Sequence, residues 1–249
     1  MLPEFVSVIA KTKKEALNFL SILENAKVIA GGTDLIVKIR AGETCGNIVD
    51  IAGIPELSNI SKEEEKIIIG AASTHARVSN NTNLKENARS LATACALIGS
   101  PQIRNMGTIG GNLVNASPAA DSIPPLLIHD AILTVEKKEA KRKANLQDFI
   151  VAPYKTTIKK DELLSSIEIK PLKGYREGYR RVTKRATWAI SRLSVAWAIR
   201  EEDDIYGDVK LAIGSCTPMP FRPKEAENFL TGAKKEEKNI SEAIKMVLE

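Results

Sequence analysis

Two glycine-rich segments constrain this chain more than any other feature of its sequence. The first, residues 28–35, contains Gly31-Gly32, and the second, residues 107–112, contains Gly110-Gly111. Each places adjacent glycines beside an apolar stretch, where backbone N–H groups without side-chain cover can approach an anion. Either segment alone is also what an ordinary tight bend looks like. Two of them, followed by the carboxylate of Asp121, predict a pair of loops that clamp a long diphosphate cofactor.

The first segment has the residue types that an anion site needs. A diphosphate carries about two negative charges, and amides of a loop or a helix start can hold it without a lysine. Residues 31–33 lie between an apolar strand and a predicted helix, which suits that role. Asp34 would repel a phosphate that it faced, so we expect it to cap its own helix.

The second segment is expected to supply another set of backbone donors from the opposite side. Asp121 is then expected to accept hydrogen bonds from ribose hydroxyls, as acidic residues do in dinucleotide folds. Both segments lack the G-x-G-x-x-G pattern of the Rossmann fold and the P-loop pattern. The cofactor would therefore be held in a different way from either of those folds.

Composition narrows the class of protein. The 249 residues suffice for one large domain or two modest ones, and 43% apolar with 27% charged residues is ordinary for a globular protein. No apolar run reaches the roughly 18–20 residues of a membrane span. Residues 1–5 lack the features of a signal peptide, so a cytoplasmic location is expected.

Charge and cysteine content exclude further classes. The net charge is +5, but the basic residues are scattered, and the densest cluster, residues 137–143, is expected to be a solvated turn instead of a nucleic-acid patch. Cys45, Cys95 and Cys216 are few and far apart, with no C-x-x-C. A disulfide framework, a metal site or an iron–sulfur cluster carried by this chain alone is not expected.

Helices and strands are predicted to alternate irregularly, which is typical of an α+β fold. Strands are expected at 27–30, 48–51, 66–71, 131–136, 163–170 and 210–215, and helices at 13–24, 34–40, 87–99 and 222–232. Residues 191–200 suit a strand or a helix. The prolines of residues 122–125 are expected to interrupt regular structure. Residues 171–174 are the best candidate linker, and residues 239–242 offer a capping box for a last helix.

Side chains for hydrolysis are not evident. The sequence has no G-x-S-x-G elbow, and neither histidine has a nucleophile at a telling spacing. We expect His75 to be a loop residue bonded to backbone and His129 to be structural. The sequence therefore favours a protein that holds a cofactor which does the chemistry, with no catalytic side chain of its own.

The motifs resemble those of one family over nearly the whole chain. Residues 30–35 (AGGTDL), 102–105 (QIRN), 108–112 (TIGGN) and 116–121 (ASPAAD) look like the FAD loops of the FAD-binding (medium) subunit of molybdenum hydroxylases. This group includes xanthine dehydrogenase, nicotinate dehydrogenase and aerobic carbon monoxide dehydrogenase. Residues 162–169 resemble the strand that closes the FAD domain, and residues 210–214 and 222–227 resemble the family's C-terminal domain.

The resemblance implies a fold and a set of cofactor contacts. It implies an α+β, PCMH-type (vanillyl-alcohol-oxidase-like) FAD-binding domain over residues 1–170, with subdomains of about 1–55 and 56–170, and a small C-terminal α/β domain over residues 175–249. Asp121 would bind a ribose, Ile98 would lie near the rings, and Leu164 would contact the flavin end by its backbone. Arg180 matches a family Lys or Arg near the flavin. The residues that would cradle the diphosphate are Val28, Ile29, Ala30, Gly31, Gly32, Thr33, Asp34, Leu35, Thr108, Ile109, Gly110, Gly111 and Asn112.

Two stretches depart from the family pattern. Residues 188–190 read Trp-Ala-Ile where the family often has Asp-Ile-Ala, which weakens residues 180–190 as flavin contacts. The chain also stops at Glu249, earlier than most relatives, so the last helices of the C-terminal domain are expected to be missing or shortened.

The function implied by the resemblance is electron transfer. The substrate is oxidised at a molybdenum cofactor on a large subunit, and two [2Fe–2S] clusters on a small subunit pass the electrons to FAD on this chain and then to NAD or another acceptor. A dimer of heterotrimers is implied. The first loop leans towards the xanthine and nicotinate branches, hence towards a purine or another N-heteroaromatic substrate.

Other classes of function stay open at this stage. A stand-alone FAD-dependent oxidoreductase of the same superfold would be active without partners, and a carbon monoxide dehydrogenase medium subunit would share most of the motifs. A nucleotide-binding or scaffold protein without catalytic activity, in which both glycine segments are plain bends, would purify colourless.

Overall fold

The N-terminal part of the chain forms a lobe around a small parallel sheet. The computed structural model describes residues 5–185 and 189–248. In the N-terminal lobe, residues 5–57, the strands β1 (Val6–Ile9), β3 (Asn47–Asp50) and β2 (Ala26–Ile29) pair in that order, and both pairings are parallel. Helix α1 (Lys13–Ile22) connects β1 to β2, and α2 (Leu35–Arg40) connects β2 to β3. The Gly31-Gly32 pair therefore lies where β2 ends and α2 is about to begin.

The body of the molecule, residues 58–172, is built on a larger antiparallel sheet. Its order is β4 (Ile60–Lys62), β5 (Ile67–Gly70), β10 (Leu163–Ile169), β6 (Ile132–Lys137) and β7 (Ala140–Asn145). The 3₁₀ helix η1 (Pro55–Leu57) precedes it, and the small hairpin β8 (Ile150–Ala152) and β9 (Lys155–Thr156) lies beside it. The helices are α3 (His75–Asn80), α4 (Thr82–Asn87), α5 (Arg89–Leu97), α6 (Pro101–Met106), α7 (Ile109–Asn115), α8 (Ile123–Ile128) and α9 (Leu146–Phe149).

Two apolar cores hold these parts together. The larger one joins the sheet of the body to its helices, and includes Ile167 of β10, Leu91 of α5 and Leu126 of α8, all without solvent exposure. A second core joins the lobe to the body, because Leu17 and Leu20 of α1 share it with Leu163 of β10. The lobe is thus fixed against the start of β10, and a cavity can form between the two.

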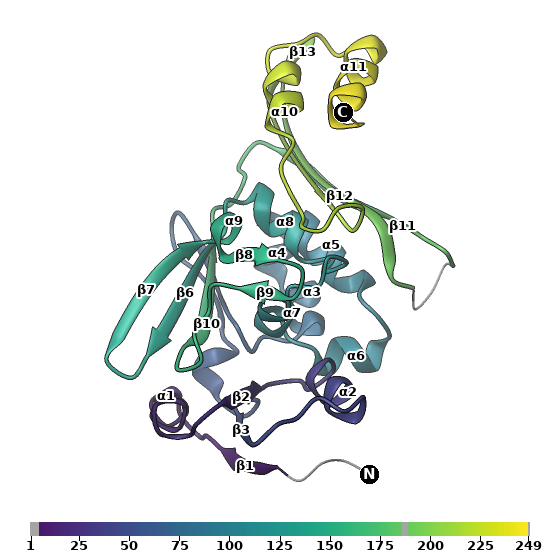
Figure 1. Ribbon diagram of the computed structural model, residues 1–249. Helices are drawn as coiled ribbons and strands as arrows, with labels where there is room; N and C mark the ends of the chain where they lie inside the picture. Colours follow the sequence, from purple (N-terminus) through teal and green to yellow (C-terminus); the bar gives the residue numbers. More distant parts are fainter. Residues whose placement is uncertain (1–4, 186–188, 249) are drawn as a thin grey trace.

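The C-terminal sheet extends away from the body, as Figure 1 shows. It consists of β11 (Arg176–Thr183), β12 (Ser191–Glu202) and β13 (Ile205–Gly214), all antiparallel. Near the body, Ala196 and Ala212 belong to the main core. At the far end the sheet packs with α10 (Lys224–Leu230) and α11 (Glu237–Leu248) around a small core of its own.

The predicted α+β class, with an FAD-type domain and a C-terminal domain, is confirmed, and three local predictions were wrong. Residues 122–125 do not interrupt the chain, because both prolines fall in the first turn of α8, where no amide is needed. The second glycine segment is the start of α7 instead of a turn. The solvated turn expected in the basic cluster 137–143 is present at residues 138–139, and the rest of the cluster belongs to the ends of β6 and β7 that flank it. Helix α11 begins at Glu237, ahead of the expected capping box. The proposed domain boundaries stay a prediction.

Candidate cofactor site

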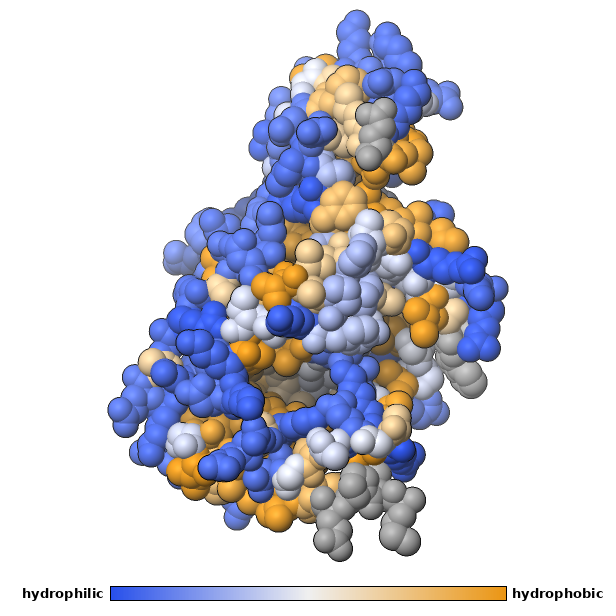
Figure 2. All heavy atoms as spheres, viewed as in Figure 1, coloured by the Kyte–Doolittle hydropathy of each residue, from blue (hydrophilic) through white to orange (hydrophobic). Residues whose placement is uncertain are grey.

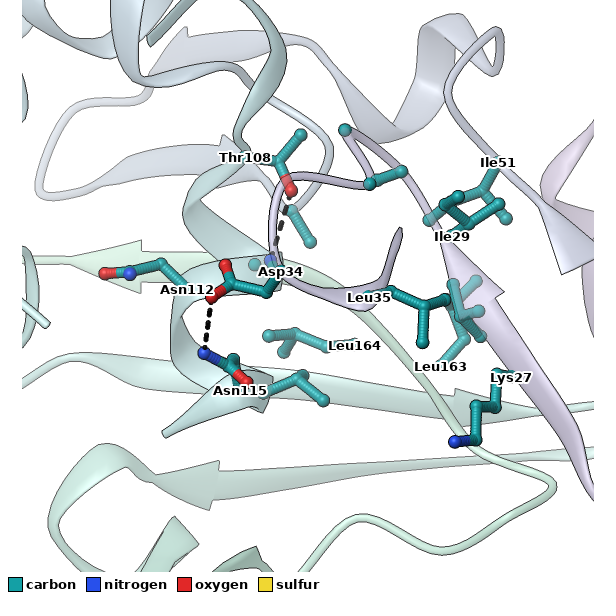
Figure 3. A pocket seen from close by; sticks show the side chains of 18 of the residues that line it. Lys27, Ile29, Asp34, Leu35, Ile51, Thr108, Asn112, Asn115, Leu163 and Leu164 are labelled. Carbon is teal, nitrogen blue, oxygen red and sulfur yellow. Dashed lines mark hydrogen bonds between the residues drawn. The ribbon is translucent and has the colours of Figure 1, made fainter. Parts of the chain in front are cut away.

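A pocket of about 340 Å³ lies between the N-terminal lobe and the body. The space-filling view shows the surface hollowed between these two parts (Figure 2). The pocket is lined from the lobe by β2, the loop 30–34 and α2, and from the body by α7 and the start of β10. The close-up shows apolar side chains on one side, among them Ile29, Leu35 and Leu163, and polar groups of α7 on the other (Figure 3). Its size suits a cofactor that is partly enclosed.

Most of the predicted cofactor contacts meet in this pocket. Both glycine segments line it, together with Leu164 from β10. The predicted residues along its wall are Val28, Ile29, Ala30, Gly31, Gly32, Thr33, Asp34, Leu35, Thr108, Gly110, Gly111, Asn112 and Leu164. Segments about 75 residues apart in the sequence are therefore neighbours in space, as the clamp hypothesis requires.

The first segment touches the start of the second through its backbone, and glycine is what allows it. A Cβ on Gly31 would lie 1.8 Å from the carbonyl oxygen of Met106 and 2.9 Å from the amide nitrogen of Gly107. Gly110 packs on the body instead, where a Cβ would lie 2.6 Å from the carbonyl oxygen of Ala71. Gly32 has a φ of +67°, which L residues with a side chain rarely adopt. The glycines at positions 31 and 110 are thus required by packing alone, whatever the pocket binds.

The first segment leaves a row of amides without partners. Within the described ranges, the backbone N–H groups of Gly31, Gly32, Thr33 and Asp34 donate to no protein acceptor. Buried or half-buried amides are nearly always paired, with protein, water or a ligand. Consecutive amides that line a pocket form the concave donor arrangement that binds phosphate. The protein groups present therefore fit a diphosphate at this loop.

The second segment differs, because its amides are already engaged. The amide of Ile109 donates to the carbonyl of Ser73, that of Gly110 to Ala71, and that of Gly111 to the hydroxyl of Thr108. The backbone donors of residues 109–111 are therefore not free, whereas no acceptor is present for the amide of Thr108 among the described residues. The helical start of α7 consumes them, and its contribution to the pocket comes from side chains such as those of Thr108 and Asn112.

Asp34 does not cap its own helix. It stands at the N-cap position of α2, but its side chain makes no capping hydrogen bond there. Its Oδ1 instead accepts a hydrogen bond of 3.1 Å from the side-chain amide of Asn115, as Figure 3 shows. The Oδ1 of Asn115 accepts from Lys38 at 2.6 Å. The carboxylate is thereby tied to α7 and joins the two walls of the pocket.

The other charges along the pocket are mostly paired. Lys27 forms an ion pair with Glu43, which lowers the pKa of that carboxyl. Glu162 accepts two hydrogen bonds of 2.8 Å from Arg142, which hold the pKa of Glu162 below its usual value. The carboxylates of Asp34, Glu43 and Glu162 along the pocket therefore each have a protein partner.

His75 is a pocket residue that sequence analysis placed in the background. It is the first residue of α3, its backbone amide donates to the carbonyl of Gly107 at 3.0 Å, and its ring lines the pocket with 3% exposure. Its Nδ1 is buried without a partner. The prediction that His75 is a loop residue was wrong, because it belongs to helix α3 and is buried. Its backbone amide is paired, but its ring nitrogen Nδ1 is not. Only the three-dimensional approach of α3 to Gly107 reveals this role.

Four predicted site residues lie outside the pocket wall. Ile109 is fully buried in the main core. Ile98 follows α5, where its carbonyl accepts from Arg104 at 2.9 Å. Arg180 is exposed on β11. Their contacts with a cofactor, and that of Asp121, stay predictions, and Trp188 lies outside the described residues.

Asp121 is the centre of a buried network. Its Oδ1 accepts from the hydroxyls of Tyr179 and Ser191, and its Oδ2 from Arg181, each at 2.6 Å. Burial, and next the charge of Asp121, raise the pKa of Tyr179. The carboxylate therefore ties β11 and β12 to the body, a role that neither sequence spacing nor composition indicated.

His129 is structural, as predicted. Its Nδ1 lies 2.8 Å from the carbonyl of Lys170 and its Nε2 lies 3.1 Å from Glu177, so both ring nitrogens have acceptors. Burial raises the pKa of Glu177, but hydrogen bonds from His129 and Ser90 outweigh this effect, and the pKa lies below its usual value.

Among the described residues, no group of three or more His, Cys, Asp or Glu side chains is placed to hold a metal ion. The helices in the described ranges are all too short or too polar to cross a membrane.

A pocket of about 340 Å³ that is lined by a loop with open amides is typical of a cofactor-binding protein, and comparison with known proteins gives its family. Residues 3–172 match the family described as the FAD binding domain in molybdopterin dehydrogenase, and residues 178–249 match the CO dehydrogenase flavoprotein C-terminal domain. The chain belongs to this family of molybdenum hydroxylase FAD subunits. It is an oxidoreductase subunit, and its own cofactor is FAD.

Similar proteins carry several different names. The chain is 34% identical to the glyceraldehyde dehydrogenase medium chain of Sulfolobus acidocaldarius, over 93% of this chain and 83% of that protein. It is 32% identical to the nicotinate dehydrogenase FAD-subunit of Eubacterium barkeri, over 90% and 78%. A structure of carbon monoxide dehydrogenase from Hydrogenophaga pseudoflava that lacks the Mo-pyranopterin moiety of the molybdenum cofactor aligns with a TM-score of 0.94 at 25% identity, over 99% of this chain and 86% of that one.

Proposed function

We propose that the pocket between β2 and α7 is the FAD site, and that the loop 31–34 holds the diphosphate. The observation that carries this proposal is that residues 31–34 line the pocket and that their backbone amides have no acceptor in the described part of the protein. The residues of β2, Leu35 and Leu164 would pack on the apolar parts of the cofactor. Thr108, at the start of α7, would add a hydroxyl from the opposite wall.

The chain would act as the flavin relay of a three-subunit hydroxylase. Bound FAD supplies the ring that carries electrons between the partner's clusters and the final acceptor. This chain's own residues bind that ring, orient it and shield it from water. The partners would be a large molybdopterin-binding subunit and a small subunit with two [2Fe–2S] clusters, assembled as a dimer of heterotrimers in the cytoplasm. The acceptor would be NAD or another oxidant.

The substrate of the complex would be an N-heteroaromatic compound such as a purine or nicotinate. The nicotinate dehydrogenase relative supports this choice, whereas the glyceraldehyde dehydrogenase relative and the carbon monoxide dehydrogenase neighbour favour other substrates. Turnover of xanthine, nicotinate, glyceraldehyde and carbon monoxide by the complex purified with its partners would decide among them.

The FAD site can be tested with two glycines that share a backbone conformation. Gly32 (φ +67°) lies in the pocket loop, and Gly174 (φ +78°) has nothing within 4 Å of an added Cβ. Alanine at either position costs roughly 1–2 kcal/mol in a left-handed conformation. Gly32→Ala is expected to weaken FAD binding by about tenfold or more because the amides are displaced, whereas Gly174→Ala should leave the affinity unchanged.

The measurement is a titration of the FAD-free chain followed by flavin absorbance and fluorescence, with unfolding curves for both variants. Equal affinities of the two variants would place the cofactor elsewhere. A wild-type chain that takes up no FAD, alone or with its partner subunits, would overturn the proposal as a whole.

A further inference from the structure

His75 has a ring nitrogen that the fold leaves without any partner. Its ring is 3% exposed and lies at the pocket wall, beside the point where the two glycine segments touch. The ring atom Cδ2 and the Thr33 hydroxyl oxygen each lie 3.3 Å from where a Cβ on Gly107 would stand. The imidazole thus flanks Gly107 on one side, and Thr33, in the row of open amides, flanks it on the other.

The hydrogen-bond pattern fixes where the ring proton is. Nδ1 is sealed from solvent and has no partner in the described part of the chain. A buried N–H without an acceptor is rare and costs more than an empty lone pair, so the proton belongs on Nε2. Nε2 is bonded to Cδ2 and therefore lies on the ring edge next to Gly107. His75 lines the pocket and Nδ1 is the buried ring nitrogen, so Nε2 is the ring nitrogen left to donate to a ligand there.

The ring is also neutral at ordinary pH. Burial, and next the positive charge of Arg104, lower the pKa of His75 to about 4. Arg104 is held in place by the carbonyls of Ile98 and Gly99, at 2.9 and 3.1 Å. A neutral imidazole with its proton on Nε2 is a hydrogen-bond donor, and Arg104 is a positive charge near it.

We infer that His75 is a cofactor-binding residue, whose Nε2–H donates a hydrogen bond to a diphosphate oxygen of FAD held against the loop 31–34. This inference rests on the proposed use of the pocket for FAD. The donor adds to the amides of Gly31 to Asp34 from the side of the body, where the amides of α7 are already engaged. The anchoring of the diphosphate is then shared between a backbone loop of the lobe and a side chain of the body.

The histidine content makes a direct test possible. The chain has only two histidines, His75 and His129, so a spectrum of a ¹⁵N-histidine-labelled chain contains two rings. His129 is the internal control, because both its nitrogens are engaged far from the pocket. In the FAD-free chain, His75 should show one protonated nitrogen, Nε2, and one unprotonated nitrogen, Nδ1. Addition of FAD should shift the Nε2 signal and a ³¹P signal of the diphosphate, and leave His129 unchanged.

Two variants of His75 measure how much the side chain contributes to FAD affinity. His75→Leu removes the donor, and His75→Gln keeps an N–H of similar reach. A hydrogen bond to a charged group corresponds to roughly 10- to 100-fold in affinity, so His75→Leu should raise the FAD dissociation constant by that factor and His75→Gln should recover most of it. Unfolding curves show whether each variant is folded, and the labelled wild-type chain gives an answer even if His75→Leu is not.

The outcomes separate this inference from the function proposed above. A wild-type chain that binds FAD while the His75 ring signals stay unchanged overturns the role of His75 and leaves the FAD site intact. The same holds if folded His75→Leu binds FAD as tightly as the wild type. A chain that binds no FAD at all, with its partners present, overturns both.

Discussion

The two glycine-rich segments look alike in the sequence and do different work in the structure. Residues 31–34 follow a strand and leave four amides open to the pocket, whereas the amides of residues 109–111 are bonded to Ser73, Ala71 and Thr108. The difference comes from what lies next to each segment. The second one runs along the body and pairs with its backbone, but the first projects from the edge of a small sheet. A glycine pair therefore indicates close backbone approach, and its neighbours decide whether the partner is protein or ligand.

The largest effect on stability is expected at Gly31, where the first segment touches the start of the second. Gly31→Ala places a Cβ 1.8 Å from a backbone oxygen of Met106, which cannot move without breaking the contact of lobe and body. We expect it to lower the free energy of unfolding by about 3 kcal/mol or more. In Gly111→Ala, the new Cβ would contact only the Thr108 hydroxyl, at 2.9 Å. This substitution should change the free energy of unfolding by less than about 1 kcal/mol. Urea unfolding of both variants checks this, and equal stabilities would mean that the segments are not in backbone contact.

The next largest effect on stability is expected at Asp121, the carboxylate that follows the second segment. Asp121→Asn leaves the buried Arg181 without its counter-charge, so we expect a loss of about 3 kcal/mol in unfolding free energy. The matched control is Asp208→Asn, because Asp208 accepts from one tyrosine hydroxyl at a more open position. It should cost less than about 1 kcal/mol.

FAD titration of the same two variants separates a structural role from ribose binding. If Asp121 acts only in the network, the affinity of folded Asp121→Asn stays within a few-fold of the wild type. A loss far beyond that, with the network otherwise intact, would show that Asp121 also contacts the cofactor, as the sequence predicts.

Much of this architecture could be predicted from the sequence, for reasons that particular elements make clear. Strand β2 and the segment 31–34 were placed correctly because apolar strands and glycine pairs are local signals. The two prolines of α8 were wrongly predicted to interrupt regular structure. Proline breaks a helix in its interior but suits its first turn, where these two lie. The partners of Asp121 could not be found at all, since Tyr179, Arg181 and Ser191 come from strands that meet it only in the folded chain.

His75 is likewise a pocket residue whose surroundings could not be predicted from the sequence. Its neighbours in sequence give no hint of a ligand, and its role depends on the distance between its ring and Gly107, which is set by the packing of α3. The free amides of residues 31–34 were foreseen, but the engaged amides of α7 were not. Which donors remain free after folding is a property of the tertiary structure, because each depends on the acceptor that packs against it.

A smaller effect should appear when the pH of the FAD-free chain is lowered. The folded pKa of His75 is about 4, below the 6.5 of an unperturbed histidine, so the unfolded chain takes up a proton at a pH where the folded chain does not. This contribution to stability is complete above pH 6.5 and is lost as the pH falls towards 4. It amounts to about 2 kcal/mol between pH 7 and pH 5.

The histidine contribution is isolated by comparison with His75→Gln. Carboxylates with lowered pKa values, Glu177 among them, also lose stability in acid, but they do so in both proteins. The wild type should therefore lose about 2 kcal/mol more than His75→Gln between the two pH values. If the unfolding free energies of the wild type and His75→Gln fall equally with pH, the folded protein does not hold the imidazole of His75 neutral.

The smallest effect on stability is expected for threonine-to-valine substitutions. They compare the two glycine-rich segments most directly, because each segment contains one threonine that receives the same substitution. Thr108 accepts a hydrogen bond of 3.1 Å from the amide of Gly111 and caps α7, so Thr108→Val should cost about 1 kcal/mol of unfolding free energy. The hydroxyl of Thr33 has no partner in the described part of the chain, so Thr33→Val should change the stability by less than about 0.5 kcal/mol. Its effect should appear instead as a several-fold weaker affinity for FAD, since the lost donor faces the ligand. If Thr33→Val destabilises the chain as much as Thr108→Val and leaves the affinity unchanged, the first segment is closed by the protein just as the second one is.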